Sequence, residues 1–209
     1  MQNISNDINS RLPFEGAYAL TEITELSGHI LEELNRAEKQ ELEVITNLRR
    51  QREYATSRQT LKKLARSIDI EALEILKDDL GRPYGQSGSK THYVSIAHTD
   101  HTVFCGISSE SAIGLDLEPA GRQVPGKLKR RILHPDEAER FANMETIRLW
   151  TIKEAYIKLR GQGLRLNMNQ VRIEQDGDEY IVELNNDKRA KICSFQSGKN
   201  WLAVAYFSN

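Results

Sequence analysis

The chain has 209 residues, and its 29 Lys and Arg side chains against 30 Asp and Glu give a formal net charge of −1. This balance argues against a general binder of nucleic acid or membrane surfaces, whose affinity comes from excess positive charge, so a charged partner must be met by a local patch. With 39% hydrophobic residues, the chain can bury a core without disulfides or metal staples.

The cysteines and the terminal segments bear on the cellular compartment. Cys105 and Cys193 each lie inside a predicted strand with no second thiol or ligand-spaced histidine nearby, so we expect both to be reduced core residues. The first residues are polar and lack the pattern of a signal peptide, and "WLAVAYF" (201–207) is too short to span a bilayer. The sequence therefore predicts a soluble, cytoplasmic protein.

The first half is predicted to be largely helical between strands. "FEGAYALTE" (14–22) alternates as a strand, and residues 26–66 have helical spacing with a break near Thr46 and Asn47. "EALEILKDDLGRPYG" (71–85) predicts a short strand that runs into a loop. After this loop, "HYVSIAH" (92–98) and "TVFCGIS" (102–108) are typical of a hairpin.

The second half repeats this order. A strand over 112–118 precedes a helical section over 124–163, and three or four β-type segments follow, around 168–175, 179–184, 189–196 and 200–207. The order of strand, helices, strands, helices and strands predicts an α+β fold with two similar halves that meet near residue 95.

An acidic pair ends the strand over 112–118. Alternation places Asp116 and Glu118 on one face, opposite the apolar Leu115 and Leu117. A lone D-x-E is most often the solvated end of a strand. Here the segment is otherwise suited to burial, and two carboxylates on one face repel each other unless a cation or proton intervenes. Oxygen ligands at this spacing suit Mg²⁺, which takes one or two protein carboxylates and completes its shell with water and phosphates.

A third carboxylate is available in "RLWTIKEAYIKLRGQGL" (148–164), where helical spacing predicts an apolar stripe and an adjacent stripe. The apolar stripe holds Leu149, Ile152, Tyr156 and Leu159, and the adjacent stripe holds Trp150, Glu154 and Lys158. A Glu four residues before a Lys is also a common decoration of an exposed helix, worth about 0.2 to 0.5 kcal/mol. Taken alone, the pair favours that reading.

Several other polar residues are ambiguous when taken singly. His98 closes a predicted strand, where a histidine is more often structural than functional. Arg82 lies between turn formers, where its planar guanidinium can grip a phosphate or simply belong to a loop. A run of arginines in "LRRQREYATSR" (48–58) is compatible with a basic helix surface.

Together and in this order, the segments resemble the 4′-phosphopantetheinyl transferase superfamily in its surfactin-synthetase-activating type. "IGLDLE" (113–118) is similar to the signature G-[IV]-D-[IV]-E, "GRPY" (81–84) to the G-[KR]-P loop, and "VSIAHT" (94–99) to [FN]-x-S-x-S-H-[ST]. "LWTIKEAYIKLRGQGL" (149–164) is similar to W-[ST]-x-K-E-[AS]-x-x-K-x-x-G-x-G-[LF]. This second signature matches at Trp150, Thr151, Lys153, Glu154, Ala155, Lys158, Gly161, Gly163 and Leu164.

The resemblance implies a fold and a reaction. The fold would be a pseudo-dimer of two α/β lobes, 1–95 on the coenzyme A side and 96–209 with the catalytic site, with the cofactor in the cleft between them. The reaction would be the Mg²⁺-dependent transfer of 4′-phosphopantetheine from coenzyme A to a carrier-protein serine, with release of adenosine 3′,5′-bisphosphate. Two readings of other classes are a non-catalytic protein that binds coenzyme A or the carrier, and a Mg²⁺-dependent phosphohydrolase.

The resemblance also implies residue roles. Asp116, Glu118 and Glu154 would hold Mg²⁺, and Glu154 would accept the serine proton. The catalytic set is Asp116, Glu154 and Lys158, of which Lys158 would face the diphosphate. The coenzyme A set is Arg49, Arg82, Pro83, His98, Thr99, Lys153 and Lys158. Ala97 departs from the pattern, since the family commonly has Ser before the His.

The expected partner is an acyl or peptidyl carrier protein with an acidic recognition helix. "GKLKRRILH" (126–134) offers Lys127, Lys129, Arg130 and Arg131 as a local basic patch, although the same residues suit a solvated helix face. We expect no nucleic-acid or membrane partner. A chain that contains both lobes needs no partner copy, so we expect a monomer.

Overall fold

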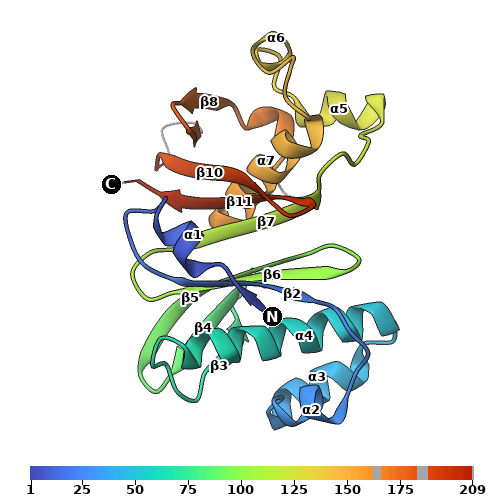
Figure 1. The fold of residues 1–209 in the computed structure, drawn as a ribbon, viewed down its shortest axis with the longest axis vertical. Coiled ribbons are helices and arrows are strands. Elements are labelled where there is room, and N and C mark those ends of the chain that lie inside the picture. Colours follow the sequence, from blue (N-terminus) through green and yellow to red (C-terminus); the bar gives the residue numbers. More distant parts are fainter. Residues whose placement is uncertain (162–165, 183–187, 209) are drawn as a thin grey trace. The chain divides into compact units, whose positions relative to one another are not determined.

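The computed structural model describes residues 1–161, 166–182 and 188–208. The chain forms two compact units, Met1–Glu110 and Ser111–Asn209 (Figure 1). The predicted boundary at residue 95 is wrong, because it cuts through β5 (Lys90–His98). β5 pairs along its length with β6 (Thr102–Ser108), so the whole hairpin belongs to the first unit.

The first unit is built on an antiparallel sheet with the order β1-β2-β6-β5-β4-β3. Its other strands are β1 (Gln2–Asn3), β2 (Ala17–Glu22), β3 (Glu74–Lys77) and β4 (Pro83–Ser87). Its helices are α1 (Ser5–Asn9), α2 (Gly28–Glu32), α3 (Arg36–Val44) and α4 (Leu48–Arg66). The predicted break at Thr46 and Asn47 is confirmed, since Asn47 caps α4 by accepting a hydrogen bond from the Arg50 amide.

Helix α4 packs on β2 and β6, and the apolar residues between them form the core of this unit. The sequence analysis missed the N-terminal pair β1 and α1, whose Ile4 and Ile8 are buried. It also assigned β4 to a loop. Cys105 and Cys193 are buried as expected, and neither forms a disulfide among the described residues.

The second unit is built on another antiparallel sheet with the order β7-β11-β10-β9-β8. Its strands are β7 (Ile113–Pro119), β8 (Ile173–Asp176), β9 (Glu179–Val182), β10 (Ala190–Ser197) and β11 (Asn200–Phe207). Its helices are α5 (Gly126–Ile132), α6 (Glu137–Arg140), α7 (Thr146–Arg160) and the 3₁₀ helix η2 (Met168–Gln170).

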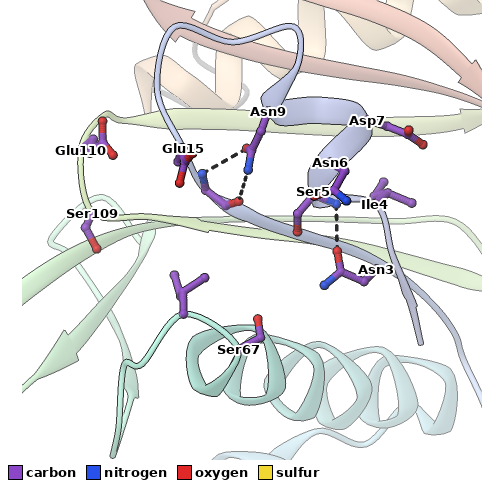
Figure 2. A pocket seen from close by; sticks show the side chains of 12 residues that line it. Asn3, Ile4, Ser5, Asn6, Asp7, Asn9, Glu15, Ser67, Ser109 and Glu110 are labelled. Atoms are coloured by element: carbon purple, nitrogen blue, oxygen red, sulfur yellow. Dashed lines mark hydrogen bonds between the residues drawn. The ribbon is translucent and has the colours of Figure 1, made fainter.

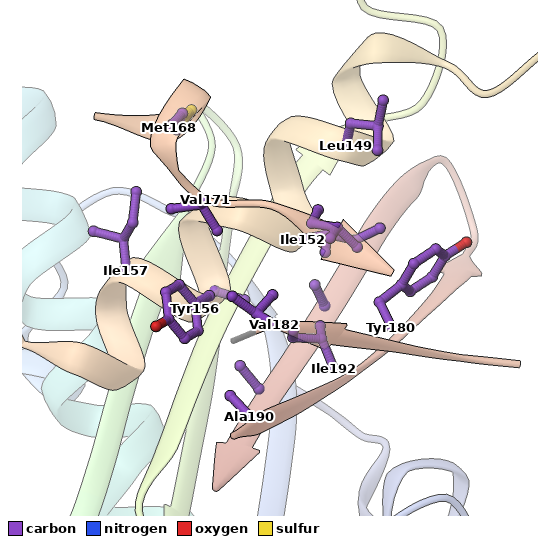
Figure 3. Packing of buried hydrophobic residues seen from close by; sticks show 14 of the residues in the cluster. Leu149, Ile152, Tyr156, Ile157, Met168, Val171, Tyr180, Val182, Ala190 and Ile192 are labelled. Carbon is purple, nitrogen blue, oxygen red and sulfur yellow. The ribbon is translucent and has the colours of Figure 1, made fainter. Parts of the chain in front are cut away.

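Helix α7 lies on this sheet and packs mainly on β7 and β11. The predicted stripe of Leu149, Ile152, Tyr156 and Leu159 is fully buried in the core (Figure 3). Gly161 ends α7 in the left-handed conformation, with φ of 68°, which a glycine adopts without strain. Gly163 and Leu164 of the second signature lie outside the described residues.

Each unit thus combines an antiparallel sheet with one long helix packed on it, which confirms the predicted α+β class. No described helix has the length and apolar character required to cross a bilayer.

Candidate active site

The candidate site lies where β7 crosses α7, and Gly114 sets the distance between them. A Cβ on Gly114 would lie 2.1 Å from the Ala155 carbonyl oxygen and 2.4 Å from the Leu159 nitrogen. Only glycine therefore permits this approach of strand to helix backbone. Asp116 follows on the same face of β7, so the crossing also holds Asp116 beside α7.

Asp116 is a buried carboxylate with two different oxygens. Its Oδ1 accepts a hydrogen bond from Lys158 Nζ at 2.8 Å. Its Oδ2 is buried, and no described residue donates a hydrogen bond to it. Burial raises the pKa of Asp116 to about 7, against the opposing effect of Lys158 and with smaller contributions from the charges of Glu154 and Glu118.

The other two predicted ligands lie in the same electrostatic neighbourhood. Burial raises the pKa of Glu154, Lys158 opposes this, and the charge of Glu118 adds to the rise. Glu118 accepts a hydrogen bond from Arg122 Nη1 at 2.5 Å. Basic side chains thus contact Asp116 and Glu118, the two carboxylates of β7.

The oxygen atoms of the three predicted carboxylates suit a hard cation, but these side chains do not form a complete set of metal ligands. Among the described residues, no three His, Cys, Asp or Glu side chains are grouped closely enough to hold a metal ion. The buried Oδ2 of Asp116 nevertheless lacks a donor in this part of the chain. An oxygen in that state is the ligand type that Mg²⁺ prefers.

The two lysines of the second signature have different environments. The side chain of Lys158 is 31% exposed at its contact with Asp116. Lys153 is fully buried, and its Nζ donates to Glu137 Oε2 at 2.6 Å and to the carbonyls of Ile132 and Met168 at 2.7 and 3.1 Å. Because all three ammonium protons are used, this geometry corrects the expectation that Lys153 contacts coenzyme A and gives it a structural role.

In the first unit, Arg49 and His98 meet at a carboxylate that the sequence analysis missed. Arg49 Nε lies 3.2 Å and His98 Nδ1 lies 3.6 Å from Glu53 Oε1. Arg49 also donates to Asp100 Oδ1 at 2.5 Å. The spacing of Arg49 and Glu53, four residues apart on a helix, was the signal available for this pair.

The remaining predicted coenzyme A residues shape turns. Thr99 Oγ1 accepts hydrogen bonds from the backbone amides of His101 and Thr102. Arg82 donates through Nε and through its amide to Asp78, in the turn that leads into Pro83 at the start of β4. These contacts keep Arg82 within its own turn and do not join it to Arg49 or His98.

The predicted basic patch is exposed. Helix α5 packs through Ile132 and Leu128. Its basic residues, Lys127, Lys129, Arg130 and Arg131, are exposed, and none of the four forms an ion pair within the described part of the chain. We call these four residues the α5 basic surface.

A hollow of about 720 Å³ in the first unit lies apart from the predicted site residues, none of which lines it. Its walls include Ser5, Asn9, Glu15, Ser67 and Glu110 (Figure 2). The Asn9 side chain closes one wall by two hydrogen bonds with the backbone of Gly16.

Comparison with known proteins defines the class of the chain as a transferase enzyme. Residues 112–206, which hold β7, α7 and all three carboxylates, match the model of the 4′-phosphopantetheinyl transferase superfamily. This match confirms the resemblance found in the sequence for residues 112–206.

Several relatives agree with this assignment. A Synechocystis protein, provisionally assigned as a 4′-phosphopantetheinyl transferase, is 25% identical over 177 residues, 72% of this chain and 71% of its own. The 4′-phosphopantetheinyl transferase gsp of Aneurinibacillus migulanus is 28% identical over 58% of this chain and 52% of its own. The 4′-phosphopantetheinyl transferase Sfp of Bacillus subtilis is 27% identical over 56% of this chain and 58% of its own.

Proposed function

We propose that the protein transfers 4′-phosphopantetheine from coenzyme A to a serine hydroxyl of an acyl or peptidyl carrier protein, with Mg²⁺, and releases adenosine 3′,5′-bisphosphate. The observation that carries the proposal is the arrangement of Asp116, Glu154 and Lys158 at the β7–α7 crossing, inside the segment that matches the superfamily. Phosphoryl transfer requires charge stabilisation on the diphosphate and a positioned base, and these residue types supply both.

Asp116, Glu118 and Glu154 are the proposed Mg²⁺ ligands. The buried Oδ2 of Asp116, which accepts no hydrogen bond from any described residue, supports this choice. When bound, Mg²⁺ neutralises charge on the diphosphate of coenzyme A.

The chain's own residues do the remaining work. Lys158 is partly exposed, so its ammonium can donate to a diphosphate oxygen. Glu154, whose pKa is raised by burial, is a stronger base than an exposed glutamate and is the proposed acceptor of the serine proton. The serine oxygen then bonds to the phosphorus of phosphopantetheine as the bond to the bridging oxygen breaks, and that oxygen leaves with adenosine bisphosphate.

Residues of the first unit are proposed to hold the adenosine end of coenzyme A. Arg49 and His98 gather at Glu53, and the Arg49 side chain is 58% exposed, so its guanidinium is accessible to a phosphate. Arg82 and Thr99, with Pro83, complete the first-unit part of the set implied by the resemblance. The α5 basic surface is proposed to dock the acidic helix of the carrier.

The test is mass spectrometry of an apo carrier protein incubated with the enzyme, Mg²⁺ and coenzyme A. Wild-type protein should add the phosphopantetheine mass, and Asp116→Ala or Glu154→Ala should abolish the addition. Glu179→Ala is the matched control, because Glu179 is a carboxylate of the same unit that pairs with Lys191 away from α7.

Each other outcome has a defined meaning. Undiminished transfer by both Ala variants would refute the ligand assignment. Coenzyme A binding without transfer to fatty-acid, polyketide or peptide carriers would indicate a non-catalytic binding protein. Phosphate release without a carrier would indicate a hydrolase.

A further inference from the structure

The ammonium group of Lys158 contacts the carboxylate of Asp116 directly. Its Nζ lies 2.8 Å from Asp116 Oδ1, and the Asp116 side chain is 9% exposed, so water screens the pair only partly. Glu118, also on β7, forms an ion pair with Arg122, which follows the strand. Two of the three proposed ligands are thus held by the chain's own cations.

In this arrangement the described carboxylates do not by themselves form a metal cage. Like charges on one face repel each other, and an ammonium on Asp116 relieves that repulsion without a divalent ion. A divalent cation that binds Asp116 must therefore compete with the ammonium of Lys158, because both seek the same carboxylate and two positive charges side by side repel.

We propose that Lys158 is an internal counter-ion that blocks divalent metal binding at Asp116 until a diphosphate draws its ammonium away. The inference rests on the proposed function, since the diphosphate is that of coenzyme A. Binding of metal and coenzyme A is then coupled and, by linkage, each strengthens the other equally. Binding of the metal to the protein in the absence of coenzyme A, which leads to no reaction, is therefore disfavoured.

The experiment measures Mn²⁺ binding by electron paramagnetic resonance at about pH 8, where Asp116 is ionised, without carrier protein. Lys158→Gln should bind Mn²⁺ alone roughly tenfold or more tightly than wild type, since a half-buried ion pair lies between the exposed and buried limits. Coenzyme A should strengthen Mn²⁺ binding to wild type but have a much smaller effect on the variant. A blank with coenzyme A and Mn²⁺ corrects for binding in solution.

The controls isolate the counter-ion effect. Lys191→Gln removes a similar ion pair of the same unit, with a contact of 2.7 Å and a lysine 32% exposed, and should leave Mn²⁺ binding unchanged. Lys158→Arg keeps a cation beside Asp116 and should bind Mn²⁺ alone as weakly as wild type does. Adenosine 3′,5′-bisphosphate lacks the diphosphate and should not strengthen Mn²⁺ binding.

Because Lys158→Gln leaves Asp116 without its cation, the variant can lose stability, so thermal unfolding gives a second readout. Mn²⁺ should raise its melting temperature by more than that of wild type. Equal Mn²⁺ affinity of wild type and Lys158→Gln, or no detectable binding by either, would overturn the counter-ion proposal. If wild type transfers no phosphopantetheine, the proposed function is overturned instead. Failure of the counter-ion proposal and failure of the proposed function are therefore distinguishable.

Discussion

Asp116 links the stability of the protein to pH through a carboxylate removed from water. Its folded-state pKa of about 7 lies above the ordinary aspartate value of 3.8, because burial outweighs the contact with Lys158. Between these two values the folded state binds more protons than the unfolded state. The free energy of unfolding therefore falls as pH rises through this window, at roughly 1.4 kcal/mol for each pH unit of full difference.

This linkage predicts that the metal-free protein is less stable at about pH 8 than at about pH 5, and that Asp116→Asn reduces the difference by a few kcal/mol. Glu154, whose pKa is also raised, contributes with the same sign and remains in the variant. Urea unfolding in a chelator at both pH values measures the effect. The same pH dependence in wild type and variant would contradict the raised pKa of Asp116.

Substitution of Lys153 should lower the stability of the protein, whereas substitution of a lysine that only binds a ligand should not. The ammonium of Lys153 and the carboxylate of Glu137 are both fully buried, and Glu137 also accepts a hydrogen bond from the Ile173 amide. Lys153→Met leaves the Glu137 charge without its partner, which should lower the free energy of unfolding by about 3 to 5 kcal/mol. Lys191→Met, in a partly exposed pair, should cost about 0 to 1 kcal/mol.

Chemical denaturation measures both variants, and the double variant Lys153→Met, Glu137→Leu should recover much of the loss, because no charge is then buried alone. A Lys153→Met protein with wild-type stability but a raised KM for coenzyme A would restore the cofactor role that the buried contacts argue against.

At the scale of elements, the crossing of β7 and α7 depends on Gly114. Gly114→Ala places a methyl group against backbone atoms of Ala155 and Leu159, which cannot move aside as a side chain can. The helix must shift from the strand, so we expect a loss of about 3 kcal/mol or more in stability. Transfer activity should fall too, since the shift separates Asp116 from Lys158.

The matched control is Gly126→Ala in α5, where no atom lies within 4 Å of the added methyl and φ is not positive. It should leave both stability and activity close to wild type. Thermal unfolding and the transfer assay together check the pair of variants. Equal melting temperatures for both variants would show that the close approach at Gly114 is not needed.

The two elements that carry the site were predictable because their patterns are periodic. Alternation in 113–118 placed Asp116 on the face opposite Leu115, and helical spacing in 148–159 placed Glu154 and Lys158 together. The helical periodicity could not predict that Lys153 is buried, because residues outside the sheet also cover α7 beside its apolar stripe. Ile132 and Met168, far away in sequence, approach Lys153 from α5 and η2.

Other elements lacked a usable local signal. Strand β4 itself contains Pro83 and Gly85, and its pairing with β3 and β5 is a tertiary effect that overrides that composition. Helix α1 has only five residues, too short for a period to show. The boundary between the units was misplaced because strand pairing, which joins β5 to β6, is not visible in the order of elements alone.

For the whole molecule, the net charge of −1 means that attraction to an acidic carrier must be local. The α5 basic surface concentrates four exposed cations on one short helix. Such charges act mainly on association, whereas the chemical step proposed above uses the carboxylates of the β7–α7 crossing. Carrier affinity and turnover should therefore be separable by mutation.

The double variant Lys129→Glu, Arg130→Glu should raise the KM for the carrier by about tenfold and change kcat and the KM for coenzyme A by less than about twofold. A higher salt concentration should raise the KM of wild type for the carrier more than it raises that of the variant. The reason is that salt screens an attraction that the variant already lacks. Lys39→Glu, an exposed charge reversal on α3 of the first unit, controls for overall charge, although it changes the net charge by half as much as the double variant does.

A comparable rise in KM per unit of charge for Lys39→Glu would assign the effect to the molecule's net charge rather than to α5. No rise in the double variant would place the docking surface elsewhere.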